Sequence, residues 1–449
     1  MKKYICFILM LLLVPFAAGT MSVQGEETDD VGLVEALEIC DAAVLQQESI
    51  TRGEFADYAV RLMNLQAQDA EGKFYSDVTA DTQYGGAIEL LTQMGYISGN
   101  GDGTYAPEQA ITTQEAVEIC VRIVTDNSFR ITGVNVLVQA QSAGLLSGLD
   151  LGENLDGEAS VRLLRRTLEA DVTRRTGFGE NVTFTQQKGQ DVLAYFFGVY
   201  RVKGIVEAAG GVSLSGQDDL QSGYARIGGA VYENTASSLR DYLGYKVEAY
   251  VNEEDQVFYF EDNNTQVITV TDEQINRSLT SVNEIVKEED GGSTRRYKLD
   301  SQVDVVYNGN GYFGYTLEDL LPEYGSLTLI DNDDDGSYEV VLVDDFVTCA
   351  VNIVNIDSNA LVDVYGRTMP DLEDVKSIRV FKNGVETTFS AIVQNNVVGI
   401  GVDKEGENAK IVISDQMVEG TIDSVGEDTV TIGGEEYKIA PSLQECQQG

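Results

Sequence analysis

The sequence contains no histidine and no tryptophan, and it has only five prolines in 449 residues. Without histidine, Ser-His-Asp and Cys-His mechanisms and histidine-ligated zinc or iron sites are excluded. Without tryptophan, an aromatic platform for a sugar must be built from the 22 tyrosines and 15 phenylalanines. The catalytic chemistry that survives these absences is hydrolysis by a pair of carboxylates.

Positive charge and cysteine are also scarce. Only 30 basic side chains face 74 acidic ones, so the formal net charge is −44. This excess repels nucleic acid and anionic membrane surfaces, and it favours solubility and cation binding. The cysteines after the first twenty residues, Cys40, Cys120, Cys349 and Cys446, show neither a CxxC pair nor metal-ligand spacing. We expect buried free thiols, with disulfides or metal binding as the alternatives.

Long apolar runs are absent except at the start of the chain. The basic start MKK is followed by an almost entirely apolar stretch at 4–16 and by small residues at 17–19. This is the layout of a secretory signal peptide, and its apolar core is too short to span a membrane. We predict a signal peptide at 1–25, cleaved after Gly19 or Gly25, and a soluble exported protein.

The hydrophobic periodicity changes about 200 residues into the chain. From 31 to about 172 the apolar residues recur at helical spacing, as in the face of Phe55, Ala59 and Leu62. From about 200 onward, alternating β-branched segments between Gly, Asn and Asp turns predict strands. These predicted strands lie at 247–251, 256–260, 266–270, 302–307, 326–330, 338–343 and 429–433.

The predicted fold is therefore multidomain, with an all-α N-terminal module of three helical repeats followed by β-rich domains made of small sheets or barrels. The module covers 26–172, and its repeats lie at about 31–66, 72–126 and 128–171. A linker helix at 173–200 and β regions at 201–275, 276–415 and 416–449 follow. The last region repeats the strand, turn and Ile-Gly-Gly pattern of 203–233 and then stops. Either this final β unit is incomplete or the sequence is truncated.

In the first third of the chain, similar sequences recur at the beginnings of the predicted helices. ITRGE at 50–54 and ITTQE at 111–115 are both capping boxes, in which a threonine and a glutamate satisfy free N–H groups of the first turn. A weaker copy, LDGE, begins at 155. One pair of short helices cannot bury its apolar face alone, so three stacked copies are a natural minimum.

The segment before the second helix start carries a longer pattern. Asp-Val at 77–78, Ala-Ile at 87–88, a glycine-rich loop with DGTY and proline at 95–107, and the start ITTQE follow in order. This order resembles the S-layer homology (SLH) repeat. The resemblance implies a three-unit module that holds a secreted protein non-covalently to the polysaccharide of a Gram-positive-type cell wall. It also implies that pyruvyl-bearing wall glycans are the usual ligand.

Arg52 is the leading ligand candidate. A cation in the first turn of a helix faces the positive end of the macrodipole, which costs about 0.3–1 kcal/mol, so its position calls for another reason. Together with the free N–H groups of the turn, it could hold an anion such as a sugar carboxylate. The alternative is a solvated arginine or one paired with a nearby carboxylate. The resemblance implies that this arginine belongs to the ligand pocket.

Departures from the family pattern limit the number of such pockets. The other copies have Thr113 and Gly157 at the arginine position, and Gln83, followed by Tyr84, stands where the family usually has tryptophan. We therefore predict at most one complete anion pocket. Its glycan-binding residues are Arg52, Asp77, Tyr84 and Gly99.

The β-rich part contains one candidate metal loop. The stretch DNDDDG at 331–336 has alternating acids and a glycine at the spacing of a calcium loop. The twelfth loop position holds leucine, so a completing carboxylate would come from Glu339, Asp344 or Asp345. The alternative is a solvated Asp/Gly hairpin turn. The candidate metal ligands are Asp331, Asp333 and Asp335.

The sequence shows no catalytic constellation. Adjacent acids, as at 253–254 or 344–345, point to opposite faces of a strand and cannot flank one bond. We predict a non-catalytic protein of the cell wall or surface layer, anchored to an anionic secondary cell-wall polysaccharide, with a β-rich outward region for structural or binding roles. Self-association in a surface layer is expected, whereas nucleic acid, a membrane span after signal removal and any cofactor other than Ca²⁺ are not. The alternatives are a wall-anchored, carboxylate-dependent glycan hydrolase and a calcium-dependent adhesin.

Overall fold

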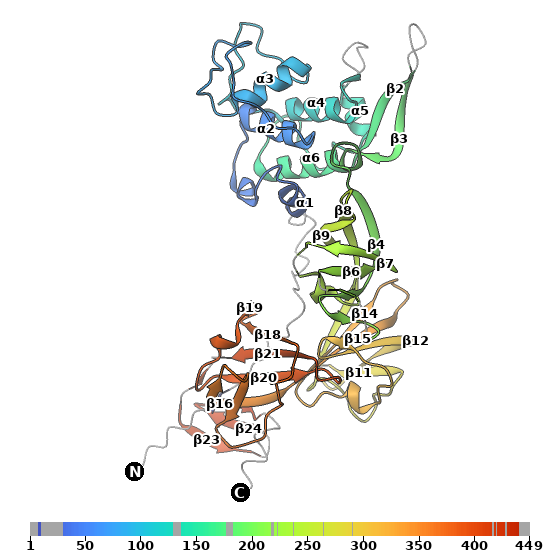
Figure 1. Cartoon of the computed structure of the whole chain (residues 1–449), viewed down its shortest axis with the longest axis vertical. Helices are drawn as coiled ribbons and strands as arrows, with labels where there is room; N and C mark the ends of the chain where they lie inside the picture. Colours follow the sequence, from blue (N-terminus) through green and yellow to red (C-terminus); the bar gives the residue numbers. More distant parts are fainter. Residues whose placement is uncertain are drawn as a thin grey trace. The chain divides into compact units, whose positions relative to one another are not determined.

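The structure is a computed structural model, and Figure 1 shows helices in the first part of the chain and strands in the rest. It describes residues 8–9, 30–128, 136–176, 183–216, 220–221, 223–236, 238–263, 265–289, 291–414, 417–418, 420–426 and 429–439. Apart from Ile8–Leu9, the predicted signal peptide lies outside these residues, as does Cys446.

The chain divides into two compact units. The helical unit consists of Met21–Arg201 and Ala249–Tyr259, and the β unit consists of Val202–Glu248 and Phe260–Gly449 together with Met1–Thr20. No helix in the described part of the chain has the length and apolar character that crossing a bilayer requires. Cys40, Cys120 and Cys349 are buried free thiols, as predicted.

Short helices form the framework of the helical unit. They are α1 (Asp30–Ala36), η1 (Ala42–Gln46), α2 (Arg52–Leu62), α3 (Gly85–Met94), α4 (Thr113–Val124), α5 (Val136–Ser142) and α6 (Gly157–Glu169). The predicted apolar face of α2 is fully buried, with Phe55, Ala59 and Leu62 each at 0% exposure. Because none of these helices is long enough to be stable alone, packing of such faces holds the unit together.

The starts of α2, α4 and α6 meet in a closed ring of backbone hydrogen bonds. The N–H of Ile50 donates to the C=O of Leu155 (2.8 Å), that of Leu155 to Ile111 (2.9 Å), and that of Ile111 to Ile50 (2.9 Å). In each case the next residue is the N-cap, whose side chain accepts a hydrogen bond from the third helical residue. The capping signals in the sequence therefore mark three equivalent positions around one centre.

The predicted linker helix at 173–200 is wrong. Strands β2 (Asp171–Thr176) and β3 (Thr183–Asp191) pair antiparallel there, and among the described residues of this segment the helical element is η3 (Leu193–Phe197), a single π-helical turn. β-Branched residues such as Val172 and the threonines favour strand over helix in the first part of this segment. The turn then ends at Gly198, whose positive φ of 65° closes it.

The first β sheet follows directly. It contains β4 (Tyr200–Ala209), β5 (Val212–Ser213), β6 (Tyr224–Ile227), β7 (Ala230–Asn234), β8 (Lys246–Val251) and β9 (Gln256–Asp262), with the short helix η4 (Leu239–Tyr242) between β7 and β8. The strand order is β5-β4-β6-β7-β9-β8, and β8 also pairs with β4. The pairing of β8 with β4 closes the strands β4, β6, β7, β9 and β8 into a ring, as in a small barrel.

Two further six-stranded sheets lie in the β unit. The second sheet has the order β10-β14-β15-β12-β11, with β13 paired to β12, and the third has the order β17-β16-β20-β21-β18-β19. Both contain a hairpin whose second strand pairs in parallel with an earlier strand, β15 with β12 and β21 with β18. Each sheet has its own buried apolar cluster.

The bounds of these strands are as follows. The second sheet has β10 (Gln266–Thr271), β11 (Glu284–Glu288), β12 (Thr294–Tyr307), β13 (Asn310–Gly311), β14 (Gly325–Asp331) and β15 (Ser337–Asp345), with η5 (Glu318–Leu320). The third has β16 (Val347–Asn355), β17 (Ala360–Asp363), β18 (Ser377–Lys382), β19 (Val385–Thr387), β20 (Val397–Val402) and β21 (Asn408–Ser414), with η6 (Phe389–Ala391). Each predicted strand coincides with a strand of the structure, except that the prediction 429–433 extends one residue beyond β24 (Thr429–Ile432), into the turn at Gly433. The β domain boundaries stay a prediction, although 276–415 contains strands of two sheets.

The last strands repeat part of the first sheet. Strands β23 (Ile422–Val425), β24 (Thr429–Ile432) and β25 (Glu435–Lys438) form a small sheet, and a two-residue strand β1 (Ile8–Leu9) pairs with β22 (Met417–Val418). The hairpins β6–β7 and β24–β25 both turn on two glycines with positive φ, at 228–229 and 433–434. Two positive φ values in a two-residue loop define a type I′ turn, which glycine adopts without strain. The Ile-Gly-Gly pattern therefore has the same backbone basis in both places.

Candidate functional site

Arg52 lies at the start of α2 beneath the loop that connects α3 and α4. Its side chain donates to the Glu115 carboxylate at 2.6 Å, to the C=O of Tyr105 at 3.0 Å and, more weakly, to the C=O of Ser98 at 3.5 Å. Its guanidinium carbon also lies 4.6 Å from the centroid of the Tyr105 ring, a cation–π distance. Arg52 is only 8% exposed. It therefore connects the first helix start with the loop and helix of the next copy.

Glu115 serves two partners. As the third residue of α4 it accepts the N–H (3.0 Å) and hydroxyl (2.9 Å) of Thr112, and its other oxygen accepts from Arg52. Burial acts to raise the pKa of Glu115, but the hydrogen bonds from Thr112 and the charge of Arg52 outweigh it and hold that pKa below its usual value. The carboxylate is thus ionised at neutral pH. Its side chain remains 43% exposed.

Asp77 and Gly99 shape the same loop. The carboxylate of Asp77 accepts the N–H groups of Tyr105 (2.9 Å) and Ala106 (2.7 Å). A Cβ at Gly99 would overlap the carbonyl of Thr104 and a ring atom of Tyr75. Both residues therefore fix the conformation of the loop that covers Arg52.

Tyr84 stands at the other side of the α2 start. It precedes α3 in the left-handed region, with φ of 60°, and it is half-buried. A Cβ at Gly53 would lie 3.4 Å from the Tyr84 ring, so the ring lies beside the first turn of α2. Burial and the neighbouring carboxylates of Glu54 and Asp57 raise the pKa of Tyr84. The predicted residues Arg52, Asp77, Tyr84 and Gly99 thus surround or form the loop at 98–107 and the helix start below it.

Sequence reasoning missed two contributors to this site. The capping box predicts only a cap role for Glu115, although a capping glutamate has a second oxygen free for another partner. The loop motif likewise predicts an aromatic residue at Tyr105 but not its contact with Arg52. The relevant contact joins residues 63 positions apart, and a single sequence does not reveal such pairs.

The positions equivalent to Arg52 have other roles. The N–H and hydroxyl of Thr113 both donate to the C=O of Glu153, at 3.0 and 3.1 Å. The N–H of Gly157 donates to the C=O of Gln47 at 3.0 Å, and a Cβ on Gly157 would overlap the carbonyl of Val44. Position 157 is therefore glycine for steric reasons, because the backbone at Val44 leaves no room for a side chain there.

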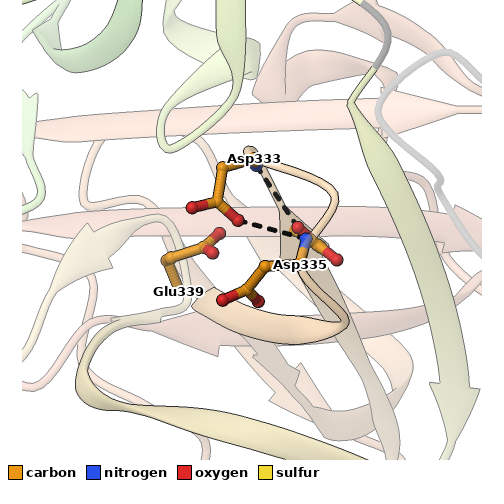
Figure 2. A group of neighbouring side chains, drawn as sticks. Asp333, Asp335 and Glu339 are labelled. Atoms are coloured by element: carbon orange, nitrogen blue, oxygen red, sulfur yellow. Dashed lines mark hydrogen bonds between the residues drawn. The ribbon is translucent and has the colours of Figure 1, made fainter.

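The acidic turn between β14 and β15 brings four carboxylates together. One oxygen each from Asp331, Asp333, Asp335 and Glu339 lies within 4.8 Å of the others. Figure 2 shows the side chains of Asp333, Asp335 and Glu339 around a common space. Burial and the charges of Asp333 and Asp331 raise the pKa of Glu339, although a backbone hydrogen bond opposes them. Glu339 is thus the residue that joins the predicted loop ligands.

The other two candidate ligands have different partners. Asp344 forms an ion pair with Lys410 at 2.8 Å, and Asp345 accepts a hydrogen bond from the hydroxyl of Tyr307 at 2.7 Å. Neither belongs to the carboxylate group of the turn among the described residues.

Asp331 also has a structural function in its turn. It is 4% exposed and accepts the N–H groups of Asp334 (2.7 Å) and Gly336 (2.9 Å). Asp403 in the corresponding hairpin β20–β21 is equally buried and accepts the N–H of Glu407 at 2.7 Å. A buried aspartate that caps the turn is therefore common to both hairpins, whereas the cluster of further carboxylates belongs to the first.

Comparison with known proteins agrees with the motif. Residues 74–117 match the family model of the S-layer homology domain. The chain is also similar to the middle cell wall protein of Brevibacillus brevis, with 20% identity over 470 residues, covering 87% of this chain and 43% of that protein. The chain thus spans less than half the length of this relative. The family match confirms the predicted S-layer homology domain at 74–117, and the two likenesses together indicate a secreted protein located in the cell wall or surface layer.

Proposed function

We propose that the helical unit is a three-repeat S-layer homology module that anchors the chain non-covalently to cell-wall polysaccharide. The ring at Ile50, Ile111 and Leu155 carries this proposal, because it relates three capped helices by the same hydrogen bonds. At each helix start, the backbone N–H of the first helical residue also donates a hydrogen bond to a carbonyl of a neighbouring loop. A stack of interdependent units is the usual arrangement of short repeats. The 74–117 match covers the middle unit.

We place the glycan site at the start of α2, between Tyr84 and the loop at 98–107. Arg52 would supply the positive charge and Tyr84 a face for a sugar ring. Since Arg52 already pairs with Glu115, a carboxylate of the polysaccharide must compete with that residue for the guanidinium. Glu115 is 43% exposed and can remain hydrated when displaced, so exchange is feasible, with a small net gain. The expected affinity per site is accordingly weak.

Pull-down of the full chain on purified cell-wall sacculi tests the site. Tyr84→Ala should reduce the retained fraction because it removes the half-buried ring proposed to contact the sugar, and Arg52→Met should reduce it further. Arg61→Met is the matched control on the same helix, since Arg61 is 48% exposed and pairs with Asp57. All variants are compared at a temperature where circular dichroism shows native helix content. Equal retention of the Tyr84 and Arg52 variants with wild type would exclude this site, and no retention of wild type would exclude wall anchoring.

We further propose that the β unit is non-catalytic and contributes structural or binding surfaces. Its adjacent acids support this, because Asp344 is held by Lys410 and Asp345 by Tyr307, which leaves neither to act as a free acid or base. Release of soluble sugar or peptide from sacculi by the purified chain would contradict it. Self-association in a surface layer stays a prediction, which analytical ultracentrifugation of the full chain tests.

A second proposal is calcium binding at the acidic turn. It is supported by the convergence of Asp331, Asp333, Asp335 and Glu339, since oxygen-rich clusters of carboxylates suit Ca²⁺. Calcium should then raise the unfolding temperature of the β unit, by up to the equivalent of about 2.7 kcal/mol at a hundredfold excess over Kd. Asp335→Asn should remove most of the shift, and Asp371→Asn, an exposed turn aspartate of the third sheet, should not. An unchanged unfolding temperature and no heat of binding would leave the turn a purely structural one.

A further inference from the structure

A cavity inside the β unit lies where η4, the second sheet and the third sheet meet. Its volume is about 110 Å³, and its walls include Arg240 of η4, Val306 and Leu342 of the second sheet, and Arg379 and Lys410 of the third. One buried water needs about 10–15 Å³ of cavity volume, so the cavity could hold roughly seven to eleven water-sized atoms. It therefore has room for a ligand with about that number of non-hydrogen atoms. No residue of the S-layer homology match lines it.

Positive charge gathers at this cavity although the chain as a whole is strongly acidic. Arg240, Arg379 and Lys410 all line it. Two of them are neutralised locally, since Arg379 donates to the Asp241 carboxylate and Lys410 pairs with Asp344 at 2.8 Å. Arg379 also pairs with Glu386 at 2.6 Å, so the three cations face three carboxylates in number. These carboxylates are unevenly shared, because Arg379 holds two of them.

The cation of the lining that has no carboxylate partner of its own is Arg240. Its guanidinium donates to the hydroxyl of Ser377 and to the side-chain carbonyl of Asn408, both at 3.0 Å. No carboxylate lies within ion-pair distance of it among the residues that the structure describes. Asn408 is itself oriented by a hydrogen bond from its amide to Asp403 at 2.8 Å, so the acceptor that holds Arg240 is fixed.

The electrostatics of Arg240 are unfavourable as they stand. Burial and the positive charge of Arg379 lower the pKa of Arg240, and the more distant carboxylates of Asp241, Glu386 and Asp403 offset this only in part. A guanidinium withdrawn from water is stabilised by an anion at hydrogen-bond distance. Two of these carboxylates, Asp241 and Glu386, are already bonded to Arg379.

We propose that this cavity binds a small organic monocarboxylate, with Arg240 as the anchoring cation. The one guanidinium without a directly bonded carboxylate offers a site for one ligand carboxylate, whereas the doubly charged phosphate would be repelled by Asp241 and Asp344. Apolar side chains in the lining, Leu243, Val306 and Phe381, would contact the carbon body of the ligand. Because the walls come from η4, the second sheet and the third sheet, a bound ligand would also stabilise the junction of these parts.

Titration calorimetry on the full chain tests this, with benzoate as the probe and benzamide as its neutral counterpart of equal size. Ionic strength is kept constant with sodium chloride, because the chain is so strongly charged. Benzoate should bind saturably with one site per chain, and benzamide at least about tenfold more weakly, as expected for loss of a charge-assisted hydrogen bond. This comparison uses the wild-type chain only, so it does not depend on the folding of a variant.

Variants then identify the anchor. Arg240→Gln should weaken benzoate binding at least about tenfold, and Arg240→Lys should retain part of the affinity. Arg296→Gln makes the same change of charge at an exposed ion pair of the second sheet and should bind as wild type does. Absence of saturable benzoate binding, equal binding of benzamide, or tighter binding of inorganic phosphate would each overturn the proposal. An undiminished affinity in folded Arg240→Gln would overturn the role of the arginine.

Discussion

Replacing Arg52 by methionine should destabilise the helical unit even in the absence of any ligand. Methionine keeps most of the buried aliphatic volume but removes the charge and every donor. The substitution therefore removes the ion pair with Glu115, the hydrogen bond to the C=O of Tyr105 and the cation–π interaction with the Tyr105 ring. It tests whether the arginine is a structural tie between two copies as well as a ligand candidate.

The magnitude follows from the burial of each interaction. The pair with Glu115 counts as partly exposed, so it contributes about 0.2–1 kcal/mol. The buried hydrogen bond to Tyr105 contributes about 1–2 kcal/mol, and the cation–π interaction about 0.5–1 kcal/mol. Removing a cation from the first turn of α2 returns about 0.3–1 kcal/mol. The net loss is about 2 kcal/mol, which for a unit of this size lowers the unfolding temperature by about 4–8 °C.

Far-ultraviolet circular dichroism at the helix band isolates this unit, because the α-helices of the described residues all lie within it. Arg61→Met on the same helix serves as control and should change stability by less than about 0.5 kcal/mol. The double variant Arg52→Met/Glu115→Gln should lose less than the sum of the single losses, because both remove the same pair. A stability of Arg52→Met equal to that of Arg61→Met would refute the structural tie, and strict additivity would refute the pair.

Two further predictions concern other positions. Gly157→Ala should lower the free energy of unfolding by about 1–3 kcal/mol or more, because the added Cβ would overlap the carbonyl of Val44. Gly152→Ala is the control and should be close to neutral, because the nearest atom to its Cβ lies at 3.4 Å. Equal unfolding temperatures of the two variants would contradict the packing argument. Burial acts to raise the pKa of Asp363, but Arg367 and backbone N–H groups lower it below its usual value, so its contribution to stability is complete above about pH 4 and is lost as the pH falls through the folded-state pKa. Urea unfolding between pH 6 and about 3 should therefore show a smaller acid loss in Asp363→Asn than in wild type, and identical pH slopes would exclude this role.

Local signals in the sequence predicted most of the elements and the family. Capping boxes, apolar faces and alternating strands depend on residues within a few positions of one another. The sequence therefore predicts them without knowledge of the fold. The same holds for the loop pattern at 95–107, which identified the S-layer homology repeat before its match at 74–117. The predicted linker helix at 173–200 is wrong because the apolar stretch near its end forms only the single turn η3, and the β-branched residues before it favour strands.

The partners of the charged side chains were decided only by tertiary structure. Arg52 could have been solvated, ligand-binding or paired, and only the approach of α4 brought Glu115 to it from 63 positions away. Asp344 and Asp345 were equal candidates for calcium until the sheets placed Lys410 and Tyr307 beside them. The sequence thus determined which segments fold and what family they resemble, because those properties are local. The structure decided which charges are compensated, because compensation depends on distances between residues that the chain order leaves far apart.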